Sequence, residues 1–192
     1  GEQAAGGGAW FEGNSLSLRD VQITGNSSSG RRGAFGGGLH CTAGDVTMRN
    51  LLIARNRTDE PDAGTGAYGG GIWFDGNSLD AKNVLLAGNG ADTGHGLYLS
   101  SGTANLRFCT VADHLVHGVY RAGGTIGVTN SVFRDNAVDI EGSATVLYSN
   151  MGDDGYAASN GNISADPLFE YGYYLGSGSP CIDAGTGTVA EA

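Results

Sequence analysis

The stretch GGGIWFDGNSLDAKNVLLAGN, residues 69–89, decides the fold, because its glycine run and its closing Asn recur along the chain. The run returns as Gly6–Gly8 and Gly36–Gly38, and in shorter form before Leu97 and Val119. Eighteen residues after the last glycine of each run stand Asn26, Asn56, Asn89, His114 and Asn136. The spacing from there to the next run varies, and a constant unit with variable insertions is typical of stacked repeats.

Within the constant unit, apolar residues alternate with polar ones in three short bursts, which favours strands over helices. In residues 69–89 the predicted inward positions hold Ile72, Phe74, Leu79, Ala81, Val84 and Leu86. In the two preceding copies they hold Ala9, Phe11, Leu16, Leu18, Val21 and Ile23, then Leu39, Cys41, Val46, Met48, Leu51 and Ile53. Three strands close one coil, and successive coils are expected to stack as parallel sheets at about 4.8 Å.

Two polar positions of the unit predict ladders of stacked side chains. The Asn at the eighteenth position is expected to satisfy backbone groups of an inner turn and to stack on its equivalents in neighbouring coils. The twelfth position holds Asp20, Asn50, Asn83 and Asn130, with Phe108 as the exception in the fourth copy. Both ladders are expected to form the fold.

The repeat resembles that of right-handed parallel β-helix proteins, and Gly161–Phe169 followed by Ser177–Gly185 is similar to their C-terminal ending. The resemblance implies an all-β, right-handed parallel β-helix (β-solenoid) of five to six coils, three short strands per coil, plus an irregular C-terminal segment. Residues 1–150 are accordingly assigned to the coils and residues 151–192 to a cap segment and tail. Such proteins are mostly secreted or surface-attached bacterial chains, so the resemblance implies an extracellular or cell-surface location.

Composition and charge exclude several classes of function. The 192 residues include 36 Gly but only 3 Pro, which does not fit collagen, and 40% are hydrophobic, enough for one core. A net charge of −10 opposes binding to nucleic acid. No apolar run approaches the roughly 18 residues that a membrane span requires. Cys41 and Cys109 fall on inward positions of different coils, so both, like Cys181, are expected to be free thiols.

One outward position, two residues after the last glycine, carries a column of rings. The column consists of Trp10, His40, Trp73, Tyr98 and Tyr120. Stacked in register, these rings would form a flat stripe that binds sugar rings or another protein chain. The competing reading is that the ladder only stabilises the parallel sheet.

A second outward position, eleven residues after the last glycine, carries a basic column. It consists of Arg19, Arg49, Lys82 and Arg107. Charges about 5 Å apart repel one another unless something negative faces them, and an acidic polysaccharide or an acidic protein surface would serve. Solvation and local acids such as Asp80 are the simpler explanation.

Catalytic and metal sites find less support in the sequence. His95, His114 and His117 are expected near one corner and are weak candidates for a metal site, without a Cys to join them. A polysaccharide lyase or hydrolase would need several Asp around Ca²⁺ or paired carboxylates on one face. The outward positions beside the rings offer no such cluster. Asp153-Asp154 is a candidate carboxylate pair, but a turn between the last coil and the cap explains it as well. No catalytic residue and no cofactor are assigned.

The sequence therefore predicts a structural or adhesive solenoid that binds glycan or protein along its faces. The alternative is a lyase or hydrolase of a pectin-like acidic glycan, or a fragment of one. The segment before Gly6 is too short for a capping helix. The unpaired edge of the first coil is thus expected to be covered by upstream residues or by a second copy, whose tail Thr186–Ala192 would add as a strand in a head-to-tail filament.

Overall fold

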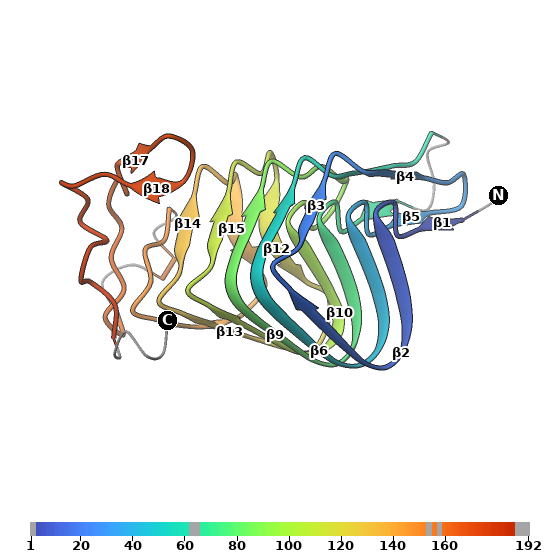
Figure 1. Cartoon of the computed structure of the whole chain (residues 1–192), viewed down its shortest axis with the longest axis horizontal. Helices are drawn as coiled ribbons and strands as arrows, with labels where there is room; N and C mark the ends of the chain where they lie inside the picture. The colour runs from blue at the N-terminus through green and yellow to red at the C-terminus, as the bar shows by residue number, and fades with distance from the viewer. Residues whose placement is uncertain (1–2, 62–65, 153–154, 157–158, 187–192) are drawn as a thin grey trace.

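The computed structural model describes residues 3–61, 66–152, 155–156 and 159–186, which form an all-β structure (Figure 1). The first nine strands are β1 (Ala4–Ala5), β2 (Ala9–Arg19), β3 (Gln22–Thr24), β4 (Ser27–Ser29), β5 (Ala34–Phe35), β6 (Leu39–Ala54), β7 (Arg57–Asp59), β8 (Ala67–Tyr68) and β9 (Ile72–Ala87). The other nine are β10 (Leu97–Arg107), β11 (Thr110–Ala112), β12 (His117–Arg121), β13 (Thr125–Thr129), β14 (Val132–Arg134), β15 (Val138–Glu141), β16 (Thr145–Leu147), β17 (Phe169–Glu170) and β18 (Tyr174–Leu175). No helix in this described part is long and apolar enough to cross a membrane.

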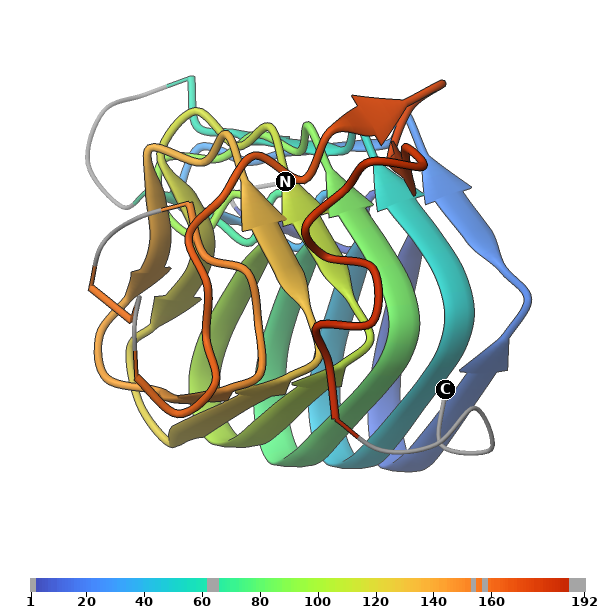
Figure 2. The same cartoon turned by 90° about the vertical axis from the view of Figure 1, so that its left-hand side faces the viewer.

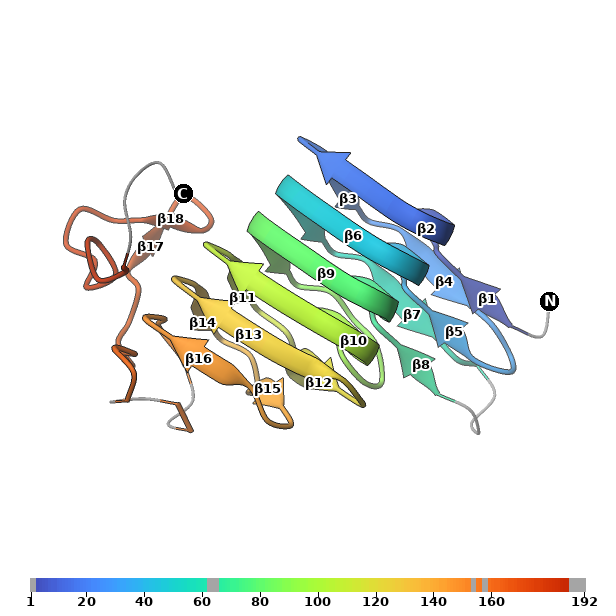
Figure 3. The same ribbon diagram turned by 90° about the horizontal axis from the view of Figure 1, so that it is seen from below.

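Successive stretches of the chain pair side by side in parallel. We call them layer 1 (β1–β4), layer 2 (β5–β7), layer 3 (β8 and β9), layer 4 (β10 and β11), layer 5 (β12–β14) and layer 6 (β15 and β16). In the largest sheet, equivalent positions of the repeat face each other, so that Leu39 lies between Ala9 and Ile72. Figure 3 shows the layers following one another in chain order. Parallel all-β architecture, as the sequence predicts, is therefore present.

The core consists of the predicted inward side chains. All six such residues of layer 2 and all six of layer 3 are buried, and Leu97, Leu99, Ala104, Leu106, Cys109 and Val111 continue the core into layer 4. In layer 1, by contrast, Phe11 and Leu16 are only partly buried, because no described strand pairs with the outer edge of β2. The period-two alternation of apolar and polar residues in the sequence therefore predicts the buried side chains correctly.

The expected three short strands per coil are separate only in layer 5. In layers 2 and 3 the predicted short strands continue into one another through the bends and form single strands of 16 residues, β6 and β9. The variable insertions also contain strands that the sequence did not predict. The short strands β1, β5 and β8 form a three-stranded parallel sheet, and β4 pairs with β7.

Glycine is required at position 37, where the backbone passes close to other backbone atoms of its own layer and of the next. A Cβ atom on Gly37 would lie 2.4 Å from the carbonyl oxygen of Arg57 and 2.6 Å from that of Gly70. Hydrogen bonds join the two glycine runs, because the Gly37 N–H donates to the Gly69 oxygen and the Gly38 N–H to the Gly70 oxygen. The glycine runs are therefore close contacts between layers rather than loose linkers.

The inner ladder forms as predicted. Asn56 is 1% exposed; its Nδ2 donates to Ile23 O (2.8 Å) and to Asn89 Oδ1 (3.0 Å). Its Oδ1 accepts from the backbone N–H of Asn26 (3.0 Å) and from Asn26 Nδ2 (2.9 Å). The Asn56 side chain thus bonds the backbone of the turn in the preceding layer and the Asn side chains on both sides, while its own N–H is bound by Asn89 Oδ1 of the next layer.

His114 replaces Asn in the fourth layer without breaking the inner ladder. Its Nε2 lies 3.3 Å from Asn89 Nδ2, and its Nδ1 lies 2.8 Å from Asn136 Oδ1. An amide nitrogen donates and an amide oxygen accepts, so this neutral ring carries its proton on Nδ1. Burial lowers the pKa of His114 to about 4, although the Asn136 bond acts in the opposite direction.

The chain after β16 lies across one end of the layers and along one side of them. Figure 2 looks along the layers from this end, with the C-terminal segment in front. The segment contains one antiparallel pair, β17 and β18. Cys181, which belongs to it, is free, as are the buried Cys41 and Cys109, so the predicted absence of a disulfide is confirmed among these three residues.

Replacement of Asn56 by Leu is predicted to lower the free energy of unfolding by at least about 3 kcal/mol, because it leaves several buried backbone and amide groups unpaired. Asn77→Leu is the matched control, since Asn77 is exposed and belongs to neither ladder. Urea unfolding monitored by circular dichroism measures both. Equal stability of the two variants would show that the inner ladder does not support the fold.

Stability is predicted to fall as the pH drops from about 6.5 to about 4. In this window an unfolded His114 binds a proton while the folded residue, with its pKa lowered to about 4, does not. The loss from this one group is roughly 3 kcal/mol, and His40 adds to it because burial lowers its pKa to about 4 as well. His114→Asn should lose distinctly less stability between pH 7 and pH 4.5 than the parent chain. An unchanged acid loss would contradict this assignment.

Candidate functional site

The chain makes a sharp bend at the twelfth position of every constant unit. Asp20, Asn50, Asn83, Phe108 and Asn130 have φ angles between 51° and 58°, in the left-handed region. Asn50 Nδ2 donates to Asp20 Oδ1 (2.8 Å), and Asn83 Nδ2 donates to Asn50 Oδ1 (3.0 Å). This second predicted ladder is therefore confirmed up to Phe108, and we call these five residues the bend ladder.

A groove of about 650 Å³ runs beside the bend ladder, and we call it the bend groove. It is lined by Asp20, Val21, Gln22, Asn50, Leu51, Leu52, Asn83, Val84, Leu85, Phe108, Thr110, Tyr173 and Tyr174. Amide side chains and short apolar stretches come from layers 1 to 4, while two tyrosines come from the C-terminal segment. Asp20 is the one carboxylate of this lining, and no Lys or Arg belongs to it.

Tyr173 fixes the tyrosine side of the bend groove. Its hydroxyl donates to Asp113 Oδ2 at 2.5 Å, which joins residues 60 positions apart in the chain. Burial raises the pKa of Tyr173, and the hydrogen bond to the Asp113 carboxylate raises it further, so the phenol stays protonated. Tyr174 beside it is 77% exposed and offers its ring to a ligand.

Phe108 is the irregular member of the bend ladder. A bulky side chain at φ 53° is strained, whereas Asn and Asp tolerate that conformation. The ring lies under Lys82, whose Nζ is 5.7 Å from the ring centroid. It also borders two hollows, the bend groove and a second cavity on the side of layers 5 and 6.

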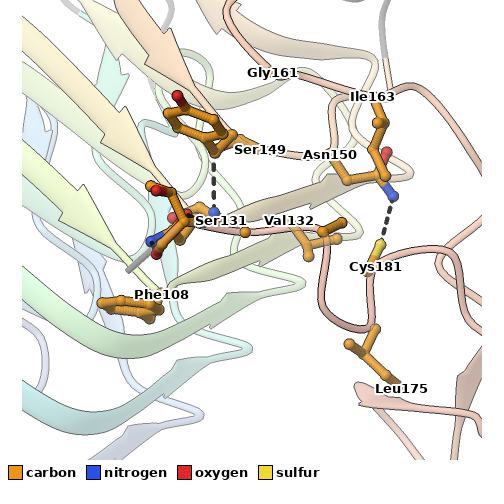
Figure 4. Close-up of a pocket in the computed structure, with 14 residues that line it drawn as sticks. Phe108, Ser131, Val132, Ser149, Asn150, Gly161, Ile163, Leu175 and Cys181 are labelled. Atoms are coloured by element: carbon orange, nitrogen blue, oxygen red, sulfur yellow. Dashed lines mark hydrogen bonds between the residues drawn. The ribbon is translucent and has the colours of Figure 1, made fainter. Parts of the chain in front are cut away.

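The second cavity, of about 240 Å³, lies between the last layers and the C-terminal segment (Figure 4). Its lining includes Val132, Ile163 and Leu175, together with two hydrogen-bonded pairs. Ser131 N–H donates to Ser149 Oγ (3.1 Å), and Asn150 Nδ2 donates to Cys181 Sγ (2.9 Å). These polar groups are already partnered, so the cavity offers mainly apolar surface.

Asn130 closes one side of this second cavity by binding the main chain of the C-terminal segment. Its Oδ1 accepts from Thr186 N–H (2.8 Å), and its Nδ2 donates to Thr186 O (2.7 Å). The bend ladder is thus occupied by the protein's own backbone at Asn130, whereas Asn50 and Asn83 face the bend groove. The later tail residues 187–192, which the head-to-tail prediction invokes, lie outside the described residues.

The predicted aromatic column is in register from layer 1 to layer 5, as the strand pairing shows for Trp10, His40, Trp73, Tyr98 and Tyr120. It is not an open stripe, however. Trp10 is 60% exposed, but His40 is only 7% exposed and the other three rings are half-buried. His40 stacks on Trp73 at 4.4 Å between centroids, and Tyr98 on Tyr120 at 5.3 Å.

The cover over this column comes from the small sheet that the sequence did not predict. Phe35 of β5 meets His40 and Trp73 edge-on, at 6.2 and 5.6 Å between ring centroids. Tyr68 of β8 meets Tyr98 at 5.1 Å. The column is therefore largely a packed seam between two sheets, and a ligand-binding role for it stays a prediction.

The basic column also forms in register, and two of its four charges share one local partner, Asp80. Asp80 Oδ2 lies 2.6 Å from Arg49 and Asp80 Oδ1 lies 2.8 Å from Arg107. Partial burial alone would raise the pKa of Asp80, but the hydrogen bonds and charges of both guanidinium groups outweigh it and lower the pKa. The column, which also includes Arg19 and Lys82, thus matches the simpler reading in which Asp80 offsets the charge.

The histidine corner does not form a metal centre of the expected kind. Both ring nitrogens of His114 are engaged in the inner ladder. Within the described ranges, no group of three or more His, Cys, Asp or Glu side chains is placed to hold a metal ion. The pair Asp153-Asp154 lies outside the described residues.

Sequence reasoning missed the tyrosine side of the bend groove. The signal was the run YGYYL at Tyr171–Leu175, an unusual density of rings in a segment without the repeat. Only the fold reveals that Tyr173 and Tyr174 of this run line the same groove as the bend ladder, because the ladder lies far upstream in the chain.

No protein-family model matches the chain, and no curated protein or solved structure is significantly similar to it. The resemblance to right-handed parallel β-helix proteins is therefore supported at the level of an all-β structure with parallel sheets. Any assignment of function rests on the chain's own geometry.

Proposed function

We propose that the chain is a right-handed parallel β-helix that acts outside the cell or at its surface as a glycan-binding, adhesive protein. The bend groove would hold a neutral polysaccharide. In-register parallel layers support the β-helix, and the resemblance of the repeat supports the location. The observation that carries the binding role is Phe108, a ring kept in a strained conformation where the neighbouring layers have Asn.

Strain of this kind persists only where the surrounding structure enforces it, and it clusters at ligand-binding and active sites. An Asn at position 108 would continue the bend ladder and relieve the backbone, whereas Phe108 interrupts the ladder and lines the bend groove. A ring there offers a surface on which a sugar ring can stack, as aromatic faces do at carbohydrate sites. Tyr174 offers a second, more exposed ring at the same groove.

The rest of the lining suits sugar hydroxyl groups. Asn50, Asn83 and Gln22 present amides that both donate and accept hydrogen bonds, as hydroxyl groups do. Leu52 and Leu85 supply apolar patches for the C–H faces of a sugar ring. The amides repeat at the strand spacing of roughly 4.8 Å, which suits a chain-like ligand that crosses the strands.

A neutral polymer fits better than an acidic one. The lining contains the carboxylate of Asp20 and no cationic side chain, and the chain carries a net charge of −10. A polyuronate would therefore meet repulsion in the groove. The basic column would also attract an acidic glycan only weakly, because Asp80 pairs with Arg49 and Arg107 and offsets part of their charge.

The other roles predicted from the sequence stay predictions. A polysaccharide lyase or hydrolase of acidic glycans, head-to-tail self-association and docking of a protein along the aromatic column are each compatible with parallel layers. The single carboxylate in the bend groove supports binding there more directly than hydrolysis by a carboxylate pair.

Tyr174→Ala is predicted to weaken glycan binding roughly three- to tenfold, because it removes one stacking ring. The matched control is Tyr171→Ala, since Tyr171 is 96% exposed in the same segment but does not line the groove. Isothermal titration with cello-, xylo- and manno-oligosaccharides, and with oligogalacturonate as the acidic counterpart, measures the affinities. Binding of oligogalacturonate alone, or equal effects of both variants, would argue against this proposal.

Phe108→Asn separates function from stability. The variant is predicted to bind the neutral oligosaccharide more weakly, while its melting temperature stays the same or rises as the left-handed strain is relieved. Differential scanning calorimetry and titration on the same sample provide both values. If the variant melts at a distinctly lower temperature and binds normally, Phe108 is a packing residue and the binding argument fails.

A further inference from the structure

Phe108 changes the hydrogen bonding of the bend ladder on both of its sides. It lies in layer 4, between Asn83 of layer 3 and Asn130 of layer 5. Along the ladder each amide donates toward layer 1, as Asn83 Nδ2 does to Asn50 Oδ1 (3.0 Å). A phenyl ring has no N–H to donate, and in the part of the chain that the structure describes no hydrogen bond reaches Asn83 Oδ1. The break therefore leaves one amide oxygen without its ladder donor.

Asn130 shows what an amide beside this break can bind. Its Nδ2, which would donate to an amide at position 108, donates instead to Thr186 O (2.7 Å). Its Oδ1 accepts from the N–H of the same residue (2.8 Å). One side-chain amide thus pairs in both directions with a neighbouring N–H and C=O.

Asn83 offers the same pairing to the bend groove. It is an exposed residue, and it lines the groove. The ladder uses one of its N–H groups, so the other N–H and the oxygen remain for a ligand. The half-buried Phe108, next in the ladder, lines the same groove and supplies apolar surface beside the amide.

We infer that the bend groove binds a glycan whose sugars carry acetamido groups, and that Asn83 pairs with one such group as Asn130 pairs with Thr186. This inference rests on the proposed binding of a neutral glycan. The acetamido N–H would donate to Asn83 Oδ1, and its C=O would accept from Asn83 Nδ2. Its methyl group suits the apolar surface of Phe108. The group is uncharged, so the net charge of −10 does not repel it.

A plain sugar and a peptide fit Asn83 less well. A sugar hydroxyl offers a single atom, whereas an acetamido group offers a donor and an acceptor atom to the same amide. An extended peptide also carries N–H and C=O groups, but they return to one side only every second residue, about 6.6 Å apart. The layers repeat at roughly 4.8 Å, so a peptide laid across them would fall out of step with Asn50 and Asn83. The acetamido glycan is therefore the ligand that this geometry favours.

The probes are tetra-N-acetylchitotetraose, cellotetraose and acetyl-tetraalanine amide. The two sugars share a β-1,4-linked backbone and differ in the acetamido group, and the peptide supplies amides without sugar rings. Isothermal titration of the 192-residue chain measures the three affinities. The chitotetraose should bind at least about fivefold more tightly than cellotetraose, as one further satisfied hydrogen bond allows. The peptide should bind more weakly than either sugar.

Three variants test where the acetamido group binds. Asn83→Ala removes the amide, so the two sugars should bind with equal affinity. Phe108→Leu removes the ring without supplying an N–H, so both affinities should fall while the preference for chitotetraose persists. Phe108→Asn also removes the ring but supplies an N–H that continues the ladder to Asn83 Oδ1, so the preference should disappear. Asn77→Ala changes an exposed amide outside the groove and should bind as the parent does.

The inference is overturned, and the proposed glycan binding retained, if cellotetraose binds the parent chain as tightly as chitotetraose does. It is also overturned if Phe108→Asn keeps the preference as fully as Phe108→Leu, or if the peptide binds as tightly as chitotetraose. If no neutral oligosaccharide binds, the proposed function fails together with the inference. Should Asn83→Ala fail to fold, the two Phe108 variants still decide whether the amide oxygen of Asn83 is used.

Discussion

Backbone hydrogen bonds between equivalent residues of neighbouring layers are the constraint on which the structure depends. They hold each residue beside its own repeat position in the next layer, as Leu39 lies between Ala9 and Ile72. Turns must obey the same rule, so their polar groups are paired by stacked side chains such as Asn56 and Asn89. Each position of the repeat thereby forms a column of equivalent residues across the layers. The side chains of an outward column therefore determine the chemistry of the strip of surface that they form.

Functional candidates arise where a column departs from its rule. Phe108 breaks the bend ladder, and in the small sheet of β1, β5 and β8 Ala5 stands at the position that Phe35 and Tyr68 take in the next two layers. Both departures border a hollow. His114 is a departure of another kind, because its ring reproduces the donor and acceptor of the Asn it replaces and keeps the inner ladder continuous. Departures that keep the hydrogen bonding serve the fold, whereas those that open a cavity or strain the backbone are candidates for binding.

The sequence predicted whatever repeats with a fixed spacing and could not predict the rest. Inward residues such as Phe74, the inner ladder at Asn56 and the registers of both outward columns follow from the eighteen-residue unit. The two-residue strands around Phe35 and Tyr68 carry no detectable period, so the cover they place on the aromatic column was not foreseen. The tyrosine side of the bend groove depends on the hydrogen bond from Tyr173 to Asp113. These two residues are 60 positions apart in the chain, so local sequence patterns do not encode their contact.

The hydrogen bonds within the bend ladder leave unused donors and acceptors for the glycan that we propose for the bend groove. Asn50 donates one N–H to Asp20 and accepts one from Asn83, which uses half of what a primary amide offers. One N–H and one lone pair remain for the bend groove, and the ladder already fixes the orientation of the side chain. A ligand that uses them has less side-chain freedom to restrict, so more of the contact energy appears as affinity. The ladder that satisfies the fold therefore also preorganises the groove.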